Sequence, residues 1–123
     1  MEKDFKNTQL EEAVEKFRSG WNKETHDWIF EESSLYLDEN TLIVAFSREY
    51  CVGRDETCHS MVYIFKPNEN DRIYYVRTYR IDPVSTNPED FVSEILSAQK
   101  SNNKITITVK MADKSEKVLS CAA

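Results

Sequence analysis

The sequence predicts an α+β domain in which helices pack on one face of an antiparallel sheet of five to six strands. A stretch near the N-terminus has apolar residues at helical spacing, and several later runs have the composition of β-strands separated by turn residues. The 123 residues, 40% hydrophobic and 31% charged, suit a single domain spanning residues 1–123. The expected order is a helix, a meander of three to four strands, a second helix and a two-stranded hairpin.

The first helix is predicted by a capping pattern and an apolar stripe. Thr8 and Glu11 have the spacing of a capping box, in which both side chains satisfy backbone N–H groups at the start of a helix. Ser19-Gly20 is its expected end, because glycine adopts the left-handed C-cap conformation without steric cost. The residues at helical spacing on one face are Leu10, Ala13, Val14, Phe17 and Trp21.

Residues 22–40 fit either a short second helix or an additional strand. The turn residues Asp38-Glu39-Asn40, followed by the apolar run that begins at Thr41, favour a β-hairpin. Three strands are then expected over residues 41–52, 57–66 and 71–81, separated by loops that contain Gly53 and Pro67.

A second helix is predicted to begin at Asn87-Pro88-Glu89-Asp90, where a capping residue precedes proline and two acids in the first turn. Its apolar stripe consists of Phe91, Ile95 and Ala98, and Ser101-Asn102-Asn103 ends it. Residues 105–111 alternate between apolar and polar side chains, which predicts a strand with one solvated face. A last short strand is expected over residues 117–121.

Side-chain alternation along the three central strands predicts a polar cluster at one end of the face that packs against the helices. The prediction assumes that Phe65 lies opposite both Val44 and Ile73. The cluster then contains Arg48, Arg77, His59, Tyr50 and Tyr79. Because guanidinium groups bind phosphate and carboxylate well, it is a candidate site for a small anionic ligand such as a nucleotide or phosphate metabolite. The structural alternative is that both arginines pair with acidic side chains.

The charge is concentrated in the N-terminal third of the chain. The net charge is −6, and residues 1–39 contain eleven acidic and five basic residues. Such a surface attracts basic proteins and repels phosphate backbones, so a protein partner is expected and a nucleic-acid partner is not. The basic and aromatic residues at alternate positions 72–80 are therefore expected to form a solvated sheet face. The candidate partner contacts are Glu11, Glu12, Glu15, Glu31 and Glu32, although each also suits an ordinary solvated surface.

Motifs for catalysis and metal binding are missing from the sequence. Two glycines are too few for a phosphate-binding loop, and Cys51, Cys58 and Cys121 lack the spacing of a zinc site, even with His59. We expect no cofactor, no metal and no membrane association, because no apolar run reaches the ~20 residues of a membrane span. The low cysteine count and the charged N-terminus favour the cytoplasm.

These observations favour a non-catalytic protein that acts by occupying a macromolecular partner, as inhibitors, immunity proteins, phage antagonists and chaperones do. Two alternatives stay open. One is binding of a small anion by the arginine, tyrosine and histidine cluster. The other is weak enzymatic activity with His59 or Tyr79 as the acid or base.

Overall fold

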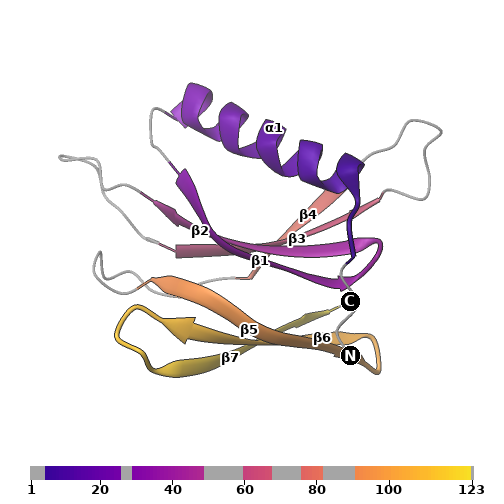
Figure 1. The fold of residues 1–123 in the computed structure, drawn as a ribbon, viewed down its shortest axis with the longest axis vertical. Helices are drawn as coiled ribbons and strands as arrows, with labels where there is room; N and C mark the ends of the chain where they lie inside the picture. The colour runs from indigo at the N-terminus through magenta and orange to yellow at the C-terminus, as the bar shows by residue number, and fades with distance from the viewer. Residues whose placement is uncertain (1–4, 26–28, 49–59, 68–75, 82–90, 123) are drawn as a thin grey trace.

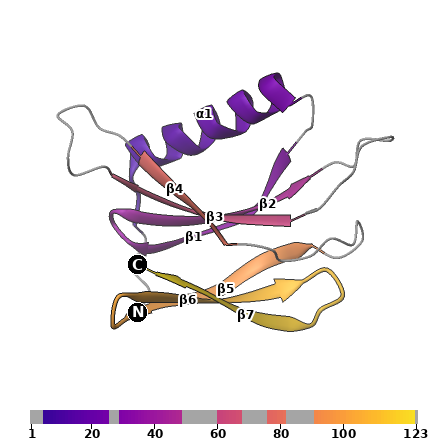
Figure 2. The ribbon, with the colours of Figure 1, turned by 180° about the vertical axis from the view of Figure 1, so that it is seen from behind.

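The computed structural model describes residues 5–25, 29–48, 60–67, 76–81 and 91–122, with residues 22–25, 48 and 76–81 described by their backbone alone. Within these residues, one helix and two antiparallel sheets stack in three layers (Figure 1). The helix covers one face of the larger sheet and the smaller sheet covers the other, as the view from behind also shows (Figure 2). The predicted α+β class with antiparallel strands is confirmed, whereas the predicted single sheet covered by helices is wrong.

The helix, α1, spans Thr8–Thr25. The larger sheet, sheet A, has the strand order β1-β2-β3-β4 and consists of β1 (Ile29–Asp38), β2 (Thr41–Arg48), β3 (Ser60–Pro67) and β4 (Val76–Ile81). The smaller sheet, sheet B, has the order β5-β6-β7 and consists of β5 (Val92–Ser101), β6 (Lys104–Met111) and β7 (Glu116–Ala122). Every neighbouring pair of strands in both sheets is antiparallel.

Helix α1 is capped by Asn7, not by Thr8 as predicted. The Asn7 side-chain oxygen accepts the backbone N–H of Leu10 at 3.2 Å, and the Asn7 side-chain nitrogen donates to the Glu39 carbonyl at 3.0 Å. The cap residue thus also fastens the helix to the β1–β2 turn. The helix continues through Gly20 to Thr25, beyond the predicted end, and a Cβ atom at Gly20 would meet no atom within 4 Å.

Replacing Asn7 with alanine is expected to lower the free energy of unfolding by about 1 kcal/mol, because the N–H of Leu10 loses its acceptor. Thr8→Ala is the matched control, since Thr8 is exposed and one position further on. Urea denaturation measures both. An equal loss for Thr8→Ala would instead support the capping box predicted from the sequence.

The core between α1 and sheet A is an aromatic cluster around Phe17. The Phe17 ring lies with its centroid 4.7 Å from that of Tyr63, 5.5 Å from that of Phe46 and 5.8 Å from that of Phe65. Leu10 and Val14 extend this core along the helix. The predicted apolar stripe of the first helix is therefore the face that it buries.

A second core fills the space between the two sheets. Sheet A contributes the other faces of β2 and β3, including Ile43 and Ile64, and sheet B contributes Ile107 and Val109. Two hydrogen bonds also join the sheets. The Ser60 hydroxyl oxygen accepts the Val92 N–H at 3.1 Å, and the Ser33 hydroxyl oxygen accepts the Ile95 N–H at 2.9 Å.

The predicted second helix is wrong, since its described part from Val92 onward forms strand β5. The apolar spacing that suggested a helix results from two β-bulges, between Val92 and Glu94 and between Ile95 and Ser97. Each bulge adds one residue, so inward positions in this strand recur every three residues instead of every two. Val92, Ile95 and Ala98 accordingly pack into the core between the sheets.

Two hairpins have short turns. The hairpin predicted at the turn Asp38-Glu39-Asn40 is confirmed, with β1 paired to β2 and the Asp38 carboxylate accepting the Asn40 N–H at 2.8 Å. Strands β5 and β6 are joined through Asn102 and Asn103, whose φ angles are 52° and 60°. Positive φ at both central residues is typical of a type I′ turn and suits asparagine. The residues predicted to end a helix therefore form a hairpin turn.

Candidate functional site

The register of sheet A differs from the one that predicted the polar cluster. The prediction put Arg77 opposite Met61 in a row with Arg48, but Met61 pairs with Phe46 and Arg77 pairs with Lys66. Arg48 is the last residue of β2, whereas Lys66 lies near the start of β2. The two arginines therefore occupy backbone positions at opposite ends of sheet A, roughly 20 Å apart along the strands. The predicted register is wrong.

Of the other members of the predicted cluster, only Tyr79 lies within the described residues. Tyr79 pairs with Ile64, whereas the prediction paired it with His59, five residues earlier in the sequence. His59 and Tyr50 lie outside the described residues, as do Cys51 and Cys58. Anion binding or acid–base chemistry by any of these residues individually stays a prediction.

The structure does bring together two of the five predicted partner contacts. Glu11 on α1 and Glu31 on β1 are exposed and line the same hollow, which has a volume of about 220 Å³. Its other lining residues are Val14, Ser34, Tyr36 and Leu42. We call this the acidic hollow. It combines two carboxylates at its edge with apolar side chains, because α1 crosses sheet A beside the outer strand β1.

Tyr36 fixes the position of one of these carboxylates. The Tyr36 hydroxyl donates to the Glu11 carboxylate at 2.9 Å and accepts the Asn7 backbone N–H at 3.0 Å. Burial raises the pKa of Tyr36, the Asn7 N–H acts against this rise, and the Glu11 carboxylate adds to it. Tyr36 thus stays a proton donor at neutral pH and holds Glu11 at the edge of the hollow.

The other three predicted contacts, Glu12, Glu15 and Glu32, have different surroundings. Glu15 forms an ion pair with Arg18, whose hydrogen bonds lower the pKa of the Glu15 carboxyl. The Glu32 carboxylate accepts the Ser47 hydroxyl. Glu12 is exposed on α1 and does not line the hollow. Glu11 and Glu31 are therefore the pair of carboxylates that the fold presents in one concave site.

Tyr36 was not among the site residues predicted from the sequence. Alternation along β1 places Tyr36 on the face toward α1, whereas Leu35 and Leu37 pack between the sheets. A tyrosine between two leucines in a strand indicates a ring that packs against a core with its hydroxyl group at the edge of that core. It could have indicated a hydrogen-bond partner on the helix.

The described part of the chain also bears on metal binding and on membrane crossing. No group of three or more His, Cys, Asp or Glu side chains is placed there to hold a metal ion. No helix there combines the length and the apolar character that crossing a membrane requires.

Comparisons with known proteins yield no relative from which a function follows. No protein-family model matches the chain, and neither a curated protein nor a solved structure matches it significantly. The functional conclusion therefore depends on the residues and the geometry of this chain alone.

Proposed function

We propose that this chain is a non-catalytic binding protein that acts by occupying a macromolecular partner, in the manner of an inhibitor, an immunity protein, a phage antagonist or a chaperone. The observation that carries the proposal is the acidic hollow, which Glu11 and Glu31 line together with the apolar residues Val14 and Leu42. The proposed partner is a protein with a basic surface, which the acidic N-terminal third would attract at long range.

The size of the hollow supports a protein partner over a small molecule at this place. Pockets for drug-sized ligands have volumes of roughly 300–1,000 Å³, whereas this hollow measures about 220 Å³. A single lysine or arginine side chain, with an apolar stem and a cationic head, matches a hollow lined by two carboxylates and by the apolar residues Val14 and Leu42. The exposed Glu12 adds to the negative potential along α1.

Neutralising both carboxylates is expected to weaken binding of an arginine-rich probe peptide about tenfold, because two charge-assisted contacts are lost. The variant is Glu11→Gln with Glu31→Gln, in which the amide oxygen at position 11 can still accept the Tyr36 hydroxyl. Chemical-shift perturbation in the ¹⁵N-labelled chain measures the affinity and locates the contact. Shifts are expected at the amides that line the hollow.

The matched control is Glu94→Gln with Glu116→Gln, which makes the same change in net charge at two exposed positions of sheet B. This pair is expected to change the affinity less than twofold, as screened distant charges do. Equal losses for both double variants would show a response to net charge alone. An affinity that is the same at low and high salt would remove electrostatic steering from the proposal.

A further inference from the structure

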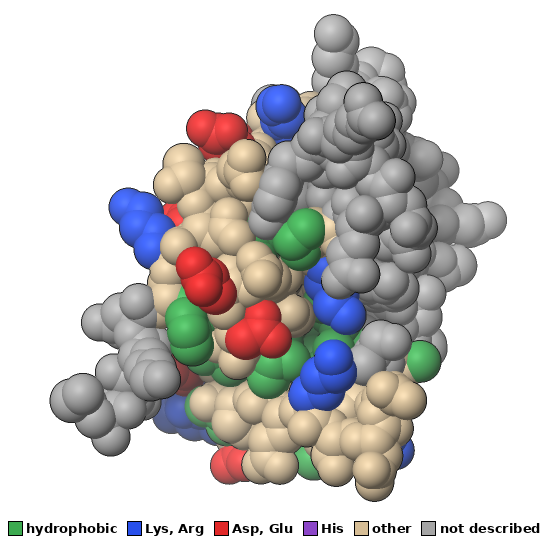
Figure 3. Space-filling view, turned by 90° about the vertical axis from the view of Figure 1, so that its right-hand side faces the viewer, with side chains coloured by type: hydrophobic (Ala, Val, Ile, Leu, Met, Phe, Trp, Pro, Cys, Tyr) green, Lys and Arg blue, Asp and Glu red, His purple; other side chains and the backbone are tan. Residues whose placement is uncertain are grey.

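A second cavity lies at the end of the molecule where β1 turns into β2, on the side where β5 turns into β6. It has a volume of about 540 Å³, and both sheets contribute to its wall. Figure 3 looks onto this end and shows acidic and basic side chains next to one another, with hydrophobic side chains between them. The lining residues used below are Asp38, Asn40, Thr41, Lys66 and Lys100.

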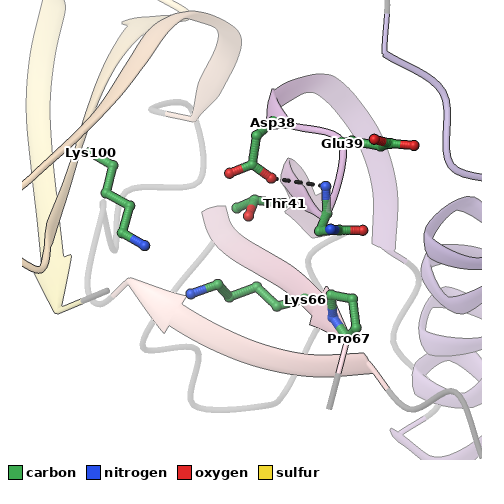
Figure 4. A pocket seen from close by; sticks show the side chains of 7 residues that line it. Asp38, Glu39, Thr41, Lys66, Pro67 and Lys100 are labelled. Atoms are coloured by element: carbon green, nitrogen blue, oxygen red, sulfur yellow. Dashed lines mark hydrogen bonds between the residues drawn. The ribbon is translucent and has the colours of Figure 1, made fainter. Parts of the chain in front are cut away.

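Two lysines from different sheets reach this cavity. Lys66 comes from the end of β3 and Lys100 from the end of β5, and their ammonium groups point toward one another with the Asp38 carboxylate above them (Figure 4). Among the described residues, neither Asp38 nor Lys100 forms an ion pair. Arg77 pairs with Lys66 in the adjacent strand, so a third basic residue is next to this position in register.

Thr41 adds a hydroxyl group to the wall of the cavity. Its residue surface is only 5% exposed, and its hydroxyl group lines the cavity, where it can donate and accept hydrogen bonds. Because the residue is packed into the cavity wall, its hydroxyl group is held in place for a polar group that enters the cavity. The Asp38 carboxylate is held on the same wall by the Asn40 N–H.

We infer that this cavity binds a small molecule that carries a phosphate or carboxylate group together with at least one hydroxyl group. The two ammonium groups would hold the anion, and the Thr41 hydroxyl would complete its hydrogen bonds. The Asp38 carboxylate would accept a hydrogen bond from the ligand's hydroxyl group. The volume lies within the range of small-molecule sites and leaves room beyond a single phosphate. This inference is independent of the partner proposed for the acidic hollow.

The experiment titrates the ¹⁵N-labelled full chain at constant ionic strength with glycerol 3-phosphate, glycerate and inorganic phosphate. Saturable shifts are expected at the amides of residues 38–41, 66–67 and 100 with one or both glycerol derivatives. Which of the two binds more tightly identifies the anionic group. Inorganic phosphate is expected to bind more weakly, because it lacks the carbon-bound hydroxyl group.

Lys100→Gln is expected to raise the Kd of the better ligand about tenfold, as loss of a charge-assisted contact does. Lys104→Gln is the matched control on the same hairpin, since Lys104 is exposed and does not line the cavity. Asp38→Asn keeps an acceptor for the Asn40 N–H and is expected to reduce the preference for the glycerol derivative over inorganic phosphate. No saturable shift at millimolar ligand, or equal effects of Lys100→Gln and Lys104→Gln, would overturn the inference.

Discussion

Replacing Phe46 with alanine is expected to lower the free energy of unfolding by about 3–5 kcal/mol, because the substitution leaves a cavity in a close-packed core. Phe46 is fully buried in β2, and its ring centroid lies 5.5 Å from that of Phe17 and 6.0 Å from that of Tyr63. Urea denaturation followed by circular dichroism measures the effect. Val118→Ala on β7 is the control, since Val118 is 67% exposed and should change the stability by less than about 0.5 kcal/mol.

The same substitution tests how α1 is attached to sheet A. The double variant Phe17→Ala with Phe46→Ala should lose about 0.5–1.5 kcal/mol less than the sum of the single variants, since the two rings contact one another. Additive losses would mean that Phe17 and Phe46 do not pack together. In that case the described packing of α1 on sheet A through these aromatic rings would be wrong.

Replacing Ser60 with alanine is expected to lower the free energy of unfolding by about 1–3 kcal/mol, because a buried N–H group loses its acceptor. Ser60 is fully buried at the start of β3, and its hydroxyl accepts the Val92 N–H of sheet B. The Val92 amide should also exchange its hydrogen faster in this variant. Thermal or urea denaturation and hydrogen exchange measure the two effects.

Ser33→Ala is the matched comparison for this contact between the sheets. Its hydroxyl accepts the Ile95 N–H in a partly buried place, where water can replace the lost acceptor. A smaller loss is therefore expected than for Ser60→Ala. Unchanged stability and unchanged Val92 exchange in the Ser60 variant would contradict the described packing of sheet B on sheet A.

Strand β5 shows why one element could not be recognised from its pattern. The sequence Asn87-Pro88-Glu89-Asp90 and the apolar spacing behind it are typical of a helix. Two bulges produce the same spacing in a strand, and bulges depend on the partner strand β6 and on the packing against sheet A. The turn Asn102-Asn103 was the local signal for a hairpin that the helical pattern obscured.

The register of sheet A could not be read from the sequence for a related reason. Residues 41–46 of β2 and residues 60–65 of β3 are buried on both faces, so the side chains do not alternate between apolar and polar. Without alternation, a shift of one strand by several residues leaves the apolar pattern almost unchanged. The predicted arginine cluster depended on such a register. The same continuous apolar runs did contain a signal for a second layer below the sheet, because a strand buried on both faces needs cover on both faces.

The candidate sites also depend in part on the sequence and in part on the fold. The sequence predicted Glu11 and Glu31 as partner contacts from charge alone, and the crossing of α1 over β1 brings them into one hollow. It predicted an anion site from arginines, while the fold gathers Lys66 and Lys100 from strands that are far apart in the chain. Charge composition is a property of the chain, but convergence of side chains requires the pairing of distant segments.

The amino-acid sequence by itself determined the α+β class, the first helix with its buried stripe, the β1–β2 hairpin and the two C-terminal strands. These elements follow from local periodicity and turn chemistry, which act over a few residues. Only the tertiary structure decided the division into two stacked sheets, the strand nature of residues 92–101 and the strand register. The reason is that these features depend on burial against distant segments. In a strand that is buried on both faces, apolar and polar side chains do not alternate, so the sequence does not indicate how the strand pairs with its neighbours.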